Sequence, residues 1–231
     1  MRLMVCPRLG VSCFHEALVT HFVSLIDPDD RETPLDQPKS TLYTLQLIFN
    51  DLDDIEMTLP MFARYTRPEE DHVARLVAFG RGMESLTDWG LLVHCEAGIS
   101  RSTASAITVI TAAGYRPAPA FGMVRRACPE MLPNRRILRM ADEMLKTNGV
   151  LLHMAENHRR KAFLRAGYED PTLVRLREAR EATVRRKVAP VAGRARFFER
   201  LLAKFSRVKK TSQPIIPPKC PSTRVRSATP R

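Results

Sequence analysis

The chain has 231 residues, 44% of them hydrophobic, and a formal net charge of +12 at pH 7. This is enough apolar material for the core of one domain of ordinary size, with residues left for an extension. The sequence has no run of about eighteen apolar residues and no long apolar stretch near its N-terminus, so neither a membrane-spanning helix nor a signal peptide is predicted. We therefore expect a cytoplasmic protein. Five cysteines without a C-x-x-C pair argue against a disulfide framework or a zinc site.

The charge is distributed very unevenly along the chain. Residues 1–150 contain 16 Lys and Arg against 19 Asp and Glu, whereas residues 151–231 contain 21 against 6. The first part thus has a net charge of −3 and the second a net charge of +15. This asymmetry predicts a folded domain over residues 1–150 and a basic extension over residues 151–231.

The first half of the predicted domain alternates short apolar runs with helical patterns. A strand is predicted at "LMVC" (3–6), a helix at "VSCFHEALVTH" (11–21) and a second strand at "FVSLID" (22–27). After a polar, Pro-rich loop, the β-branched and aromatic run "TLYTLQLIF" (41–49) predicts a third strand. That strand ends at the acidic cluster "NDLDD" (50–54).

The second half continues the alternation. Thr66, Pro68 and Glu69 resemble a capping box that begins a helix with one apolar face. The run Leu91–Val93 predicts a buried strand, and "RSTASAITVITAAG" (101–114) predicts the helix after it. Further helices are predicted at "PAPAFGMVRRA" (117–127) and at "NRRILRMADEMLKTNG" (134–149), the latter capped by Asn134. The pattern predicts an α/β fold with a central, mostly parallel sheet flanked by helices.

Cys95 lies on the loop between a predicted strand and a predicted helix. Such a loop directs several backbone N–H groups into one concavity at a helix N-terminus, where the helix dipole also favours an anion. Thiols placed there beside an arginine have pKa values of roughly 3.5 to 7.5 instead of about 8.5, which makes them nucleophiles. Cys95 meets both conditions, because Arg101 follows at the end of the loop.

The other residues of this loop suit the binding of a phosphate. The planar guanidinium of Arg101 can hold two phosphate oxygens, and Gly98 lets the backbone approach a ligand closely. The hydroxyl of Ser102 can donate a hydrogen bond to the sulfur and so stabilise a thiolate, and His94 can hold the end of the strand through its ring nitrogens.

The motif "HCEAGISRS" (94–102) resembles the H-C-x-x-G-x-x-R-S/T signature of cysteine-dependent protein tyrosine and dual-specificity phosphatases. The resemblance implies a tyrosine phosphatase-like fold and attack of Cys95 on a phosphomonoester through a phosphocysteine intermediate, without a metal or other cofactor. It also implies that one loop binds the phosphoryl group, formed by Glu96, Ala97, Gly98, Ile99, Ser100 and Arg101. The runs "HFVSLIDP" and "CPEMLPNRR" further resemble small bacterial-type tyrosine phosphatases.

Members of this family use an aspartate from a separate, upstream loop as general acid and then as general base. The cluster "NDLDD" occupies the corresponding place, and the resemblance assigns this role to Asp51, with Asp53 and Asp54 as alternatives. Glu96 within the loop disfavours a polyanionic headgroup, so the substrate expected is protein phosphotyrosine. Two alternatives stay open: a catalytically inactive phosphopeptide-binding relative, and an RNA 5′-phosphatase of the same mechanism. Tyrosine-only or dual specificity, the pathway and the oligomeric state stay open as well.

The basic extension has a pattern of its own. A helix is predicted from Asp170 and Pro171 onward, and "RARFFERLLAKFSRVKK" (194–210) has the pattern of a basic amphipathic helix. The Pro-rich end of the chain, from about residue 206, is predicted to be disordered. An acidic partner, an anionic membrane surface and nucleic acid are the three classes of partner that this composition allows.

Overall fold

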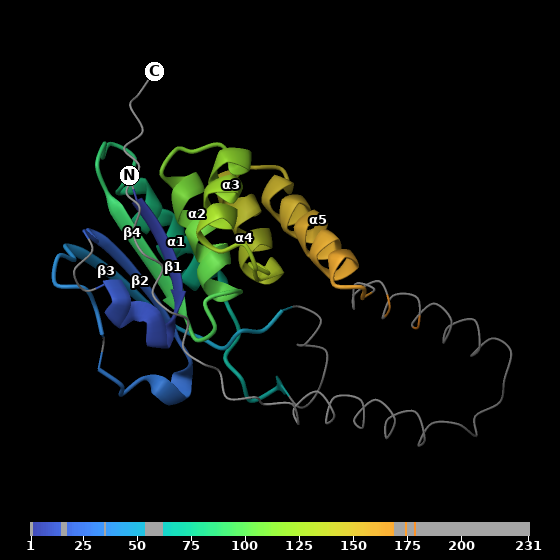
Figure 1. The fold of residues 1–231 in the computed structure, drawn as a ribbon, viewed down its shortest axis with the longest axis horizontal. Helices are drawn as coiled ribbons and strands as arrows, with labels where there is room; N and C mark the ends of the chain where they lie inside the picture. The colour runs from blue at the N-terminus through green and yellow to red at the C-terminus, as the bar shows by residue number, and fades with distance from the viewer. Residues whose placement is uncertain are drawn as a thin grey trace, which may run out of the picture. The chain divides into compact units, whose positions relative to one another are not determined.

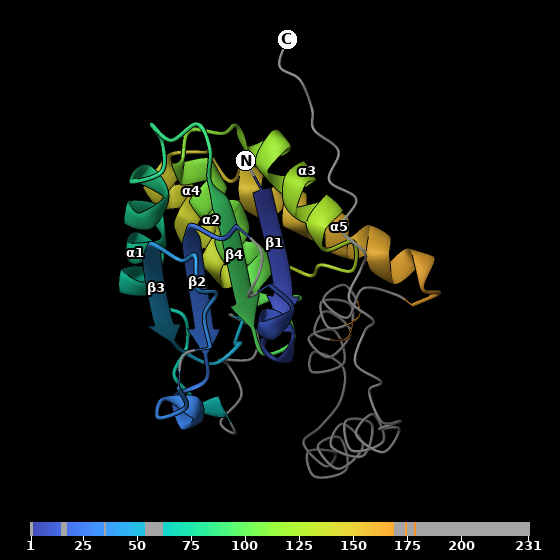
Figure 2. The ribbon, with the colours of Figure 1, turned by 60° about the vertical axis from the view of Figure 1, so that its left-hand side comes forward.

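The computed structural model describes residues 2–14, 18–34, 36–53 and 62–168, together with Val174 and Glu178. Its strands form one sheet in the order β1-β4-β2-β3, in which every pairing is parallel (Figure 1). They are β1 (Arg2–Pro7), β2 (His21–Ile26), β3 (Tyr43–Ile48) and β4 (Gly90–Cys95). The prediction of an α/β fold with a parallel sheet is therefore confirmed, and the strands end along one edge of the sheet, where their arrowheads lie in Figure 2.

The helices gather on one face of this sheet (Figure 2). They are α1 (Glu70–Arg81), α2 (Arg101–Ala112), α3 (Pro117–Ala127), α4 (Arg135–Leu145) and α5 (Val150–Arg165). Side chains alternate across β4, so Leu91, Val93 and Cys95 join the large core under the helices. Leu92 joins a smaller cluster with Cys6, Val11, Val19 and Phe22. Because both faces are covered, β4 is apolar along most of its length, as buried parallel strands are.

The segment after β1 differs from the prediction. A 3₁₀ helix, η1, spans Arg8–Phe14 where an α-helix was expected from residue 11, and residues 15–17 lie outside the described part. Val11 is the buried residue of η1. One buried side chain does not make the apolar face that holds an amphipathic α-helix against a core, so the short 3₁₀ form results.

Helix α1 also begins later than predicted. Its N-cap is Glu69, which forms a capping box with His72: the Glu69 side chain accepts from the backbone N–H of His72, and the Glu69 backbone N–H donates to the ring of His72. Thr66, the predicted cap, pairs instead with Asn50, through its backbone N–H to Asn50 Oδ1 at 3.0 Å. The acidic segment after β3 is thereby tied to the chain that enters α1.

The predicted beginning of α4 is confirmed, and its end lies earlier than expected. Asn134 caps the helix by accepting from the backbone N–H of Ile137 at 3.1 Å. The helix ends at Leu145, because Lys146 adopts a left-handed conformation with φ 55°. The carboxylate of Asp142 then accepts from the backbone N–H groups of Leu151 and Leu152, and so caps the beginning of α5.

The chain divides into two compact units, residues 1–170 and 171–231. The first unit ends later than the boundary near residue 150 that the charge asymmetry predicts, because Leu151 and Ala155 of α5 are buried in the core of the domain. Of the second unit only Val174 and Glu178 are described, and both are helical. The predicted amphipathic helix at 194–210 and the predicted disordered end lie outside the described residues. Among the residues that are described, no helix is both long and apolar enough to cross a membrane.

Candidate active site

The segment from Cys95 to Arg101 has the predicted strand-loop-helix arrangement. Cys95 is the last residue of β4, and Arg101 is the first residue of α2. Gly98, in the middle of the loop, has φ +73°, and a Cβ atom there would lie 2.4 Å from the backbone nitrogen of Pro7. The loop is thus pressed against the end of β1, in a conformation and a space that only glycine suits.

The sulfur of Cys95 lies among hydrogen-bonding groups of this loop. The backbone N–H of Gly98 donates to Sγ at 3.3 Å, and the hydroxyl of Ser102 lies 3.2 Å from Sγ. Cys95 is 1% exposed and Ser102 is fully buried. When the sulfur is a thiolate, the hydroxyl can donate to it as well, so two donors and the N-terminus of α2 favour a negative charge at this position.

The guanidinium of Arg101 is buried and held from one side. Its Nη1 donates to Asp27 Oδ1 at 2.8 Å and to the backbone carbonyl of Phe49 at 2.6 Å. Arg101 Nε is buried and has no hydrogen-bond partner. Buried donors in proteins are nearly always paired, so this unpaired N–H is available for a ligand. Asp27 was not identified from the sequence, although its position directly after β2 places it at the edge where β4 also ends.

Asp51 reaches the phosphate loop through Ser100. The hydroxyl of Ser100 donates to Asp51 Oδ1 at 2.8 Å, and Asn134 Nδ2 donates to the same oxygen at 2.9 Å. Asp53 is turned to a different partner, the Nε of Arg135 at 2.6 Å. Asp54 lies outside the described residues. Of the two described aspartates, it is Asp51 whose carboxylate contacts the loop.

His94 lies on the opposite face of the sheet from Cys95. Its Nε2 is 2.8 Å from Ser24 Oγ, and its ring stacks on Phe22 with centroids 5.4 Å apart. Burial is the largest cause that lowers the pKa of His94, to about 4, and the charges of Arg8 and Arg101 act in the same direction. The ring is therefore neutral near pH 7, and its contacts hold the end of β4 in place.

The remaining loop residues contact neighbouring segments of the chain. Glu96 and Ala97 are exposed, and the Glu96 carboxylate lies 3.6 Å from Arg8 Nη1. The backbone of Ile99 accepts from the N–H of Leu132 at 3.0 Å, in the segment that follows α3. Cys128, at the beginning of that segment, lies with its Sγ 3.5 Å from the carbonyl of Gly98. Burial raises the pKa of Cys128 to about 12, so this thiol stays protonated and acts as packing.

No family model matches this chain, and no curated protein matches it. Among solved structures it is similar to human DUSP28, with 22% identity over 64% of this chain and 94% of that chain and a TM-score of 0.46. It is also similar to human tyrosine phosphatase-like serine/threonine/tyrosine-interacting protein, with 18% identity, 63% and 92% coverage and a TM-score of 0.46. It is similar to DUSP15 as well, with 20% identity over 67% of this chain and 90% of that chain and a TM-score of 0.42.

The solved structures found in this way carry names from the phosphatase family that the sequence signature indicates. The narrower resemblance to small bacterial-type tyrosine phosphatases finds no support in these comparisons.

Proposed function

We propose that this protein hydrolyses phosphomonoesters through a phosphocysteine intermediate, with protein phosphotyrosine as its substrate. The observation that carries the proposal is the arrangement around Cys95. Its sulfur faces the N–H of Gly98 and the hydroxyl of Ser102, and the buried Nε of Arg101 in the same loop has no partner. A nucleophile and an unused donor for a phosphate oxygen thus lie at the two ends of one loop.

The chemistry follows from these positions. The Cys95 thiolate attacks phosphorus, a P–S bond forms, and the P–O bond to the leaving group breaks. Asp51 gives its proton to the leaving oxygen as the bond breaks, then takes a proton from the water that attacks the phosphocysteine. That second attack breaks the P–S bond and releases inorganic phosphate and the thiolate. Arg101 and the loop N–H groups stabilise the phosphoryl oxygens in both steps.

The loop composition favours a substrate with one phosphate. Glu96 is exposed beside the loop, and its charge opposes a second or third phosphate group nearby. Ala97 and Ile99 add no cation. A headgroup with several phosphates needs basic residues at such positions, whereas a phosphotyrosine side chain brings one phosphate on an uncharged ring.

The test is hydrolysis of para-nitrophenyl phosphate and of a phosphotyrosine peptide by the full chain, with and without a metal chelator. The Cys95→Ser variant removes the thiolate and keeps the donors of the loop, and Cys13→Ser, at an exposed cysteine, is the matched control. We expect chelator-resistant turnover that is lost in Cys95→Ser and kept in Cys13→Ser.

Two results would lead to the alternatives. If the wild-type chain does not turn over either substrate but binds the peptide in a manner that depends on Arg101, the protein is a phosphopeptide-binding relative without activity. If 5′-phosphorylated RNA is hydrolysed much faster than the peptide, the substrate class is RNA.

A further inference from the structure

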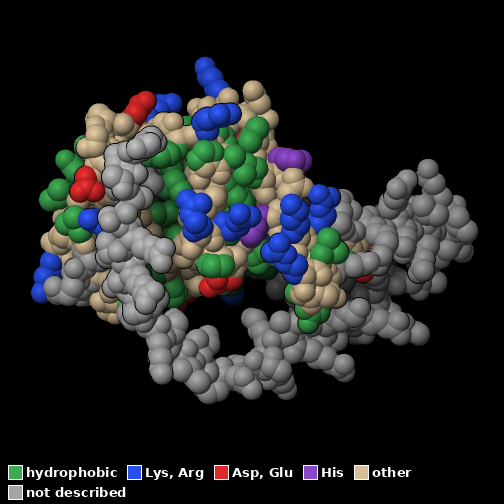
Figure 3. All heavy atoms as spheres, turned by 45° about the horizontal axis from the view of Figure 1, so that its top comes forward, with side chains coloured by type: hydrophobic (Ala, Val, Ile, Leu, Met, Phe, Trp, Pro, Cys, Tyr) green, Lys and Arg blue, Asp and Glu red, His purple; other side chains and the backbone are tan. Residues whose placement is uncertain are grey.

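Helices α3 and α5 are rich in cations. Helices α3 and α5 together contain six Lys and Arg residues and one acidic residue, Glu156. Five of these cations are exposed and form no ion pair within the part of the chain that the structure describes: Arg125, Arg126, Arg160, Lys161 and Arg165. Three of the five, Arg125, Lys161 and Arg165, also lower the pKa of one and the same histidine, His158. We call these three residues the α3–α5 basic cluster. Figure 3 shows Lys and Arg side chains gathered on the helical face of the molecule.

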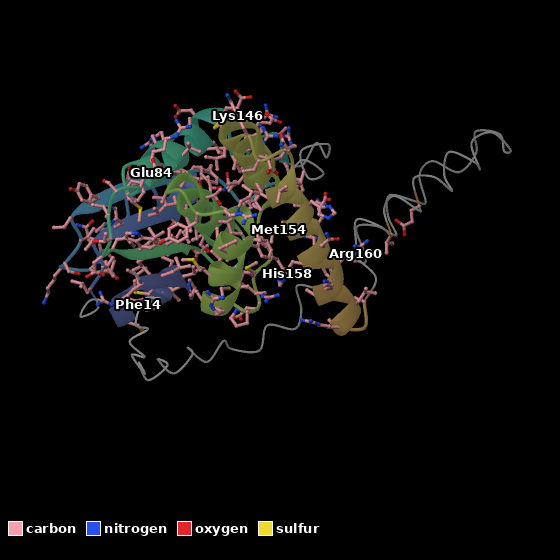
Figure 4. All side chains as sticks on the ribbon, turned by 90° about the horizontal axis from the view of Figure 1, so that it is seen from above. Phe14, Glu84, Lys146, Met154, His158 and Arg160 are labelled. Atoms are coloured by element: carbon pink, nitrogen blue, oxygen red, sulfur yellow. The ribbon has the colours of Figure 1, made fainter. Side chains whose placement is uncertain are left out.

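The cluster is centred on His158. The ring of His158 packs edge-on against Phe121 of α3, with centroids 5.7 Å apart, and Figure 4 shows the residue on the side of α5 toward the other helices. Burial lowers the pKa of His158, and the charges of Arg125, Arg165 and Lys161 lower it further. Three cations from two helices thus act on one neutral ring.

A short chain of contacts links the cluster to the phosphate loop. His158 Nε2 lies 3.1 Å from the carbonyl of Met131, and the next residue, Leu132, donates its backbone N–H to Ile99 of the loop at 3.0 Å. Helix α3 runs toward the edge where the strands end (Figure 2), and Cys128, which follows its last residue, has its Sγ 3.5 Å from the carbonyl of Gly98 in the loop. The cluster is therefore connected to the phosphate loop by two routes, through Cys128 at the end of α3 and through Met131 and Leu132.

We propose that the α3–α5 basic cluster binds acidic residues beside the phosphorylated residue of a protein substrate. The inference rests on the proposed phosphatase function. An extended peptide advances about 3.3 Å per residue, so carboxylates a few positions from the phosphorylated residue reach beyond the loop onto α3 and α5. Exposed cations without a carboxylate of their own complement such a segment and increase its rate of encounter.

An acidic peptide fits this surface better than a lipid surface does. A helix that lies on a membrane buries a row of apolar side chains along its length. Helix α3 exposes no large apolar side chain, and α5 exposes Val150 and Leu164 at opposite ends. The described surface therefore offers charge without the apolar area that lipid insertion needs.

The experiment compares two phosphotyrosine peptides, one flanked by Asp and Glu and one by Ser and Gln, as substrates of the full chain at low ionic strength. The variant Arg125→Glu/Lys161→Glu reverses two charges of the cluster. The matched control is Arg116→Glu, which reverses an exposed arginine at the other end of α3. Like the double variant, it leaves the charge of residues 171–231 unchanged. We expect kcat/KM to be about tenfold higher for the acidic peptide, since each exposed charge pair contributes only modestly.

In the double variant we expect this preference to disappear through a higher KM, with kcat and the hydrolysis of para-nitrophenyl phosphate unchanged. The control variant should keep the preference, and added salt should weaken it. A preference retained in the double variant would overturn the inference, because the extension would then be its source. Cosedimentation with phosphatidylserine vesicles that depends on Arg125 and Lys161, without any peptide preference, would also overturn it in favour of lipid.

Failure of the proposed function is recognised separately. If the wild-type chain does not hydrolyse para-nitrophenyl phosphate, the inference is tested by binding instead. Fluorescence anisotropy then measures the affinity of the two labelled peptides for the wild-type chain, the double variant and the control variant. Tighter binding of the acidic peptide that is lost only in the double variant supports the cluster. Equal binding of both peptides rejects it.

Discussion

Asp27 and Arg101, separated by 74 positions in the chain, form an ion pair of 2.8 Å beside the phosphate loop. The Arg101 side chain is 3% exposed, so water contributes little to the stabilisation of its charge. Asp27 supplies the opposite charge. This contact uses Nη1, whereas the buried Nε of the same guanidinium has no hydrogen-bond partner. Asp27 thus acts as a positioning residue for the arginine.

Asp27→Asn should therefore raise KM for para-nitrophenyl phosphate, and Asp27→Ala should raise it further. Without the Asp27 carboxylate the Arg101 guanidinium is no longer held in the one orientation that binds phosphate. Misplacement of such a group lowers the rate by up to about a hundredfold. Asp30→Asn, which removes the partner of Arg8, is the control and should leave the kinetics unchanged. Lower thermal stability of Asp27→Ala with normal kinetics would show a structural role only.

Substitutions of Asp51 and Asp53 should show which of the two aspartates is the general acid. Asp51→Asn keeps an oxygen that can accept from Ser100 and Asn134, but it has no proton to give, so we expect roughly a hundredfold lower kcat or more on substrates with poor leaving groups. Asp53→Asn should mainly weaken the contact with Arg135 and lower stability. If Asp53→Asn or Asp54→Asn shows the larger kinetic loss, the assignment of the general acid to Asp51 is wrong.

Ser102→Ala should slow turnover by roughly ten- to a hundredfold, because a hydrogen bond to a charged group contributes about 1.5–3 kcal/mol. The thiolate is both the nucleophile of the first step and the leaving group of the second, so both steps lose this donor. Steady-state and burst kinetics on para-nitrophenyl phosphate measure the effect. Ser102→Thr keeps a hydroxyl and should recover much of the rate. Equal rates for the alanine and threonine variants would contradict a role for the hydroxyl.

Gly98→Ala should abolish activity and lower the free energy of unfolding by more than about 2 kcal/mol. The substitution places a side chain in a left-handed conformation and brings Cβ within 2.4 Å of Pro7 N and 2.5 Å of the Cys6 carbonyl carbon. Gly122→Ala in α3, where the nearest atom would be Arg126 Nη1 at 3.6 Å, is the matched control and should stabilise by roughly 0.5–1 kcal/mol. Denaturant unfolding of the two variants is the measurement, and equal stability would contradict the close approach of loop and β1.

The neutral His94 predicts a loss of stability in acid. Its pKa falls from 6.5 to about 4 on folding, mainly through burial, so the unfolded chain binds the proton more readily between these values. Stability from this residue is present above pH 6.5 and is lost as the pH falls through about 4, by about 3 kcal/mol. Urea unfolding at pH 4 to 7 should show a smaller pH dependence for His94→Asn than for the wild-type chain. The same slope in both would contradict the burial of the ring.

Much of the local structure was predictable because it depends on neighbouring residues. The apolar run of β4, the loop from Cys95 to Arg101, the bounds of α3 and the cap of α4 at Asn134 all follow from patterns a few residues long. The spacing of the signature also places the nucleophile and the arginine at the two ends of one loop, whatever the rest of the chain does. These features need no knowledge of distant contacts.

The partners of those residues could not be predicted in the same way. Asp27 meets Arg101 across 74 positions, Asp51 meets Ser100 across 49, and Asn134 meets Asp51 across 83. Such pairs form only because the parallel sheet brings the ends of β2, β3 and β4 to one edge, where side chains of different loops compete for the same donors.

The place where the domain ends was also beyond the sequence pattern. The change of charge near residue 150 is real, but α5 begins there and is held by two buried residues, Leu151 and Ala155, and by the carboxylate of Asp142. The charged side chains lie on the exposed face of α5, whereas the packing of α5 against the domain depends on its buried face. The motif thus located the nucleophile and the arginine, and composition indicated the basic character of the chain's end. Packing determined which acids contact these residues and which helix belongs to the core.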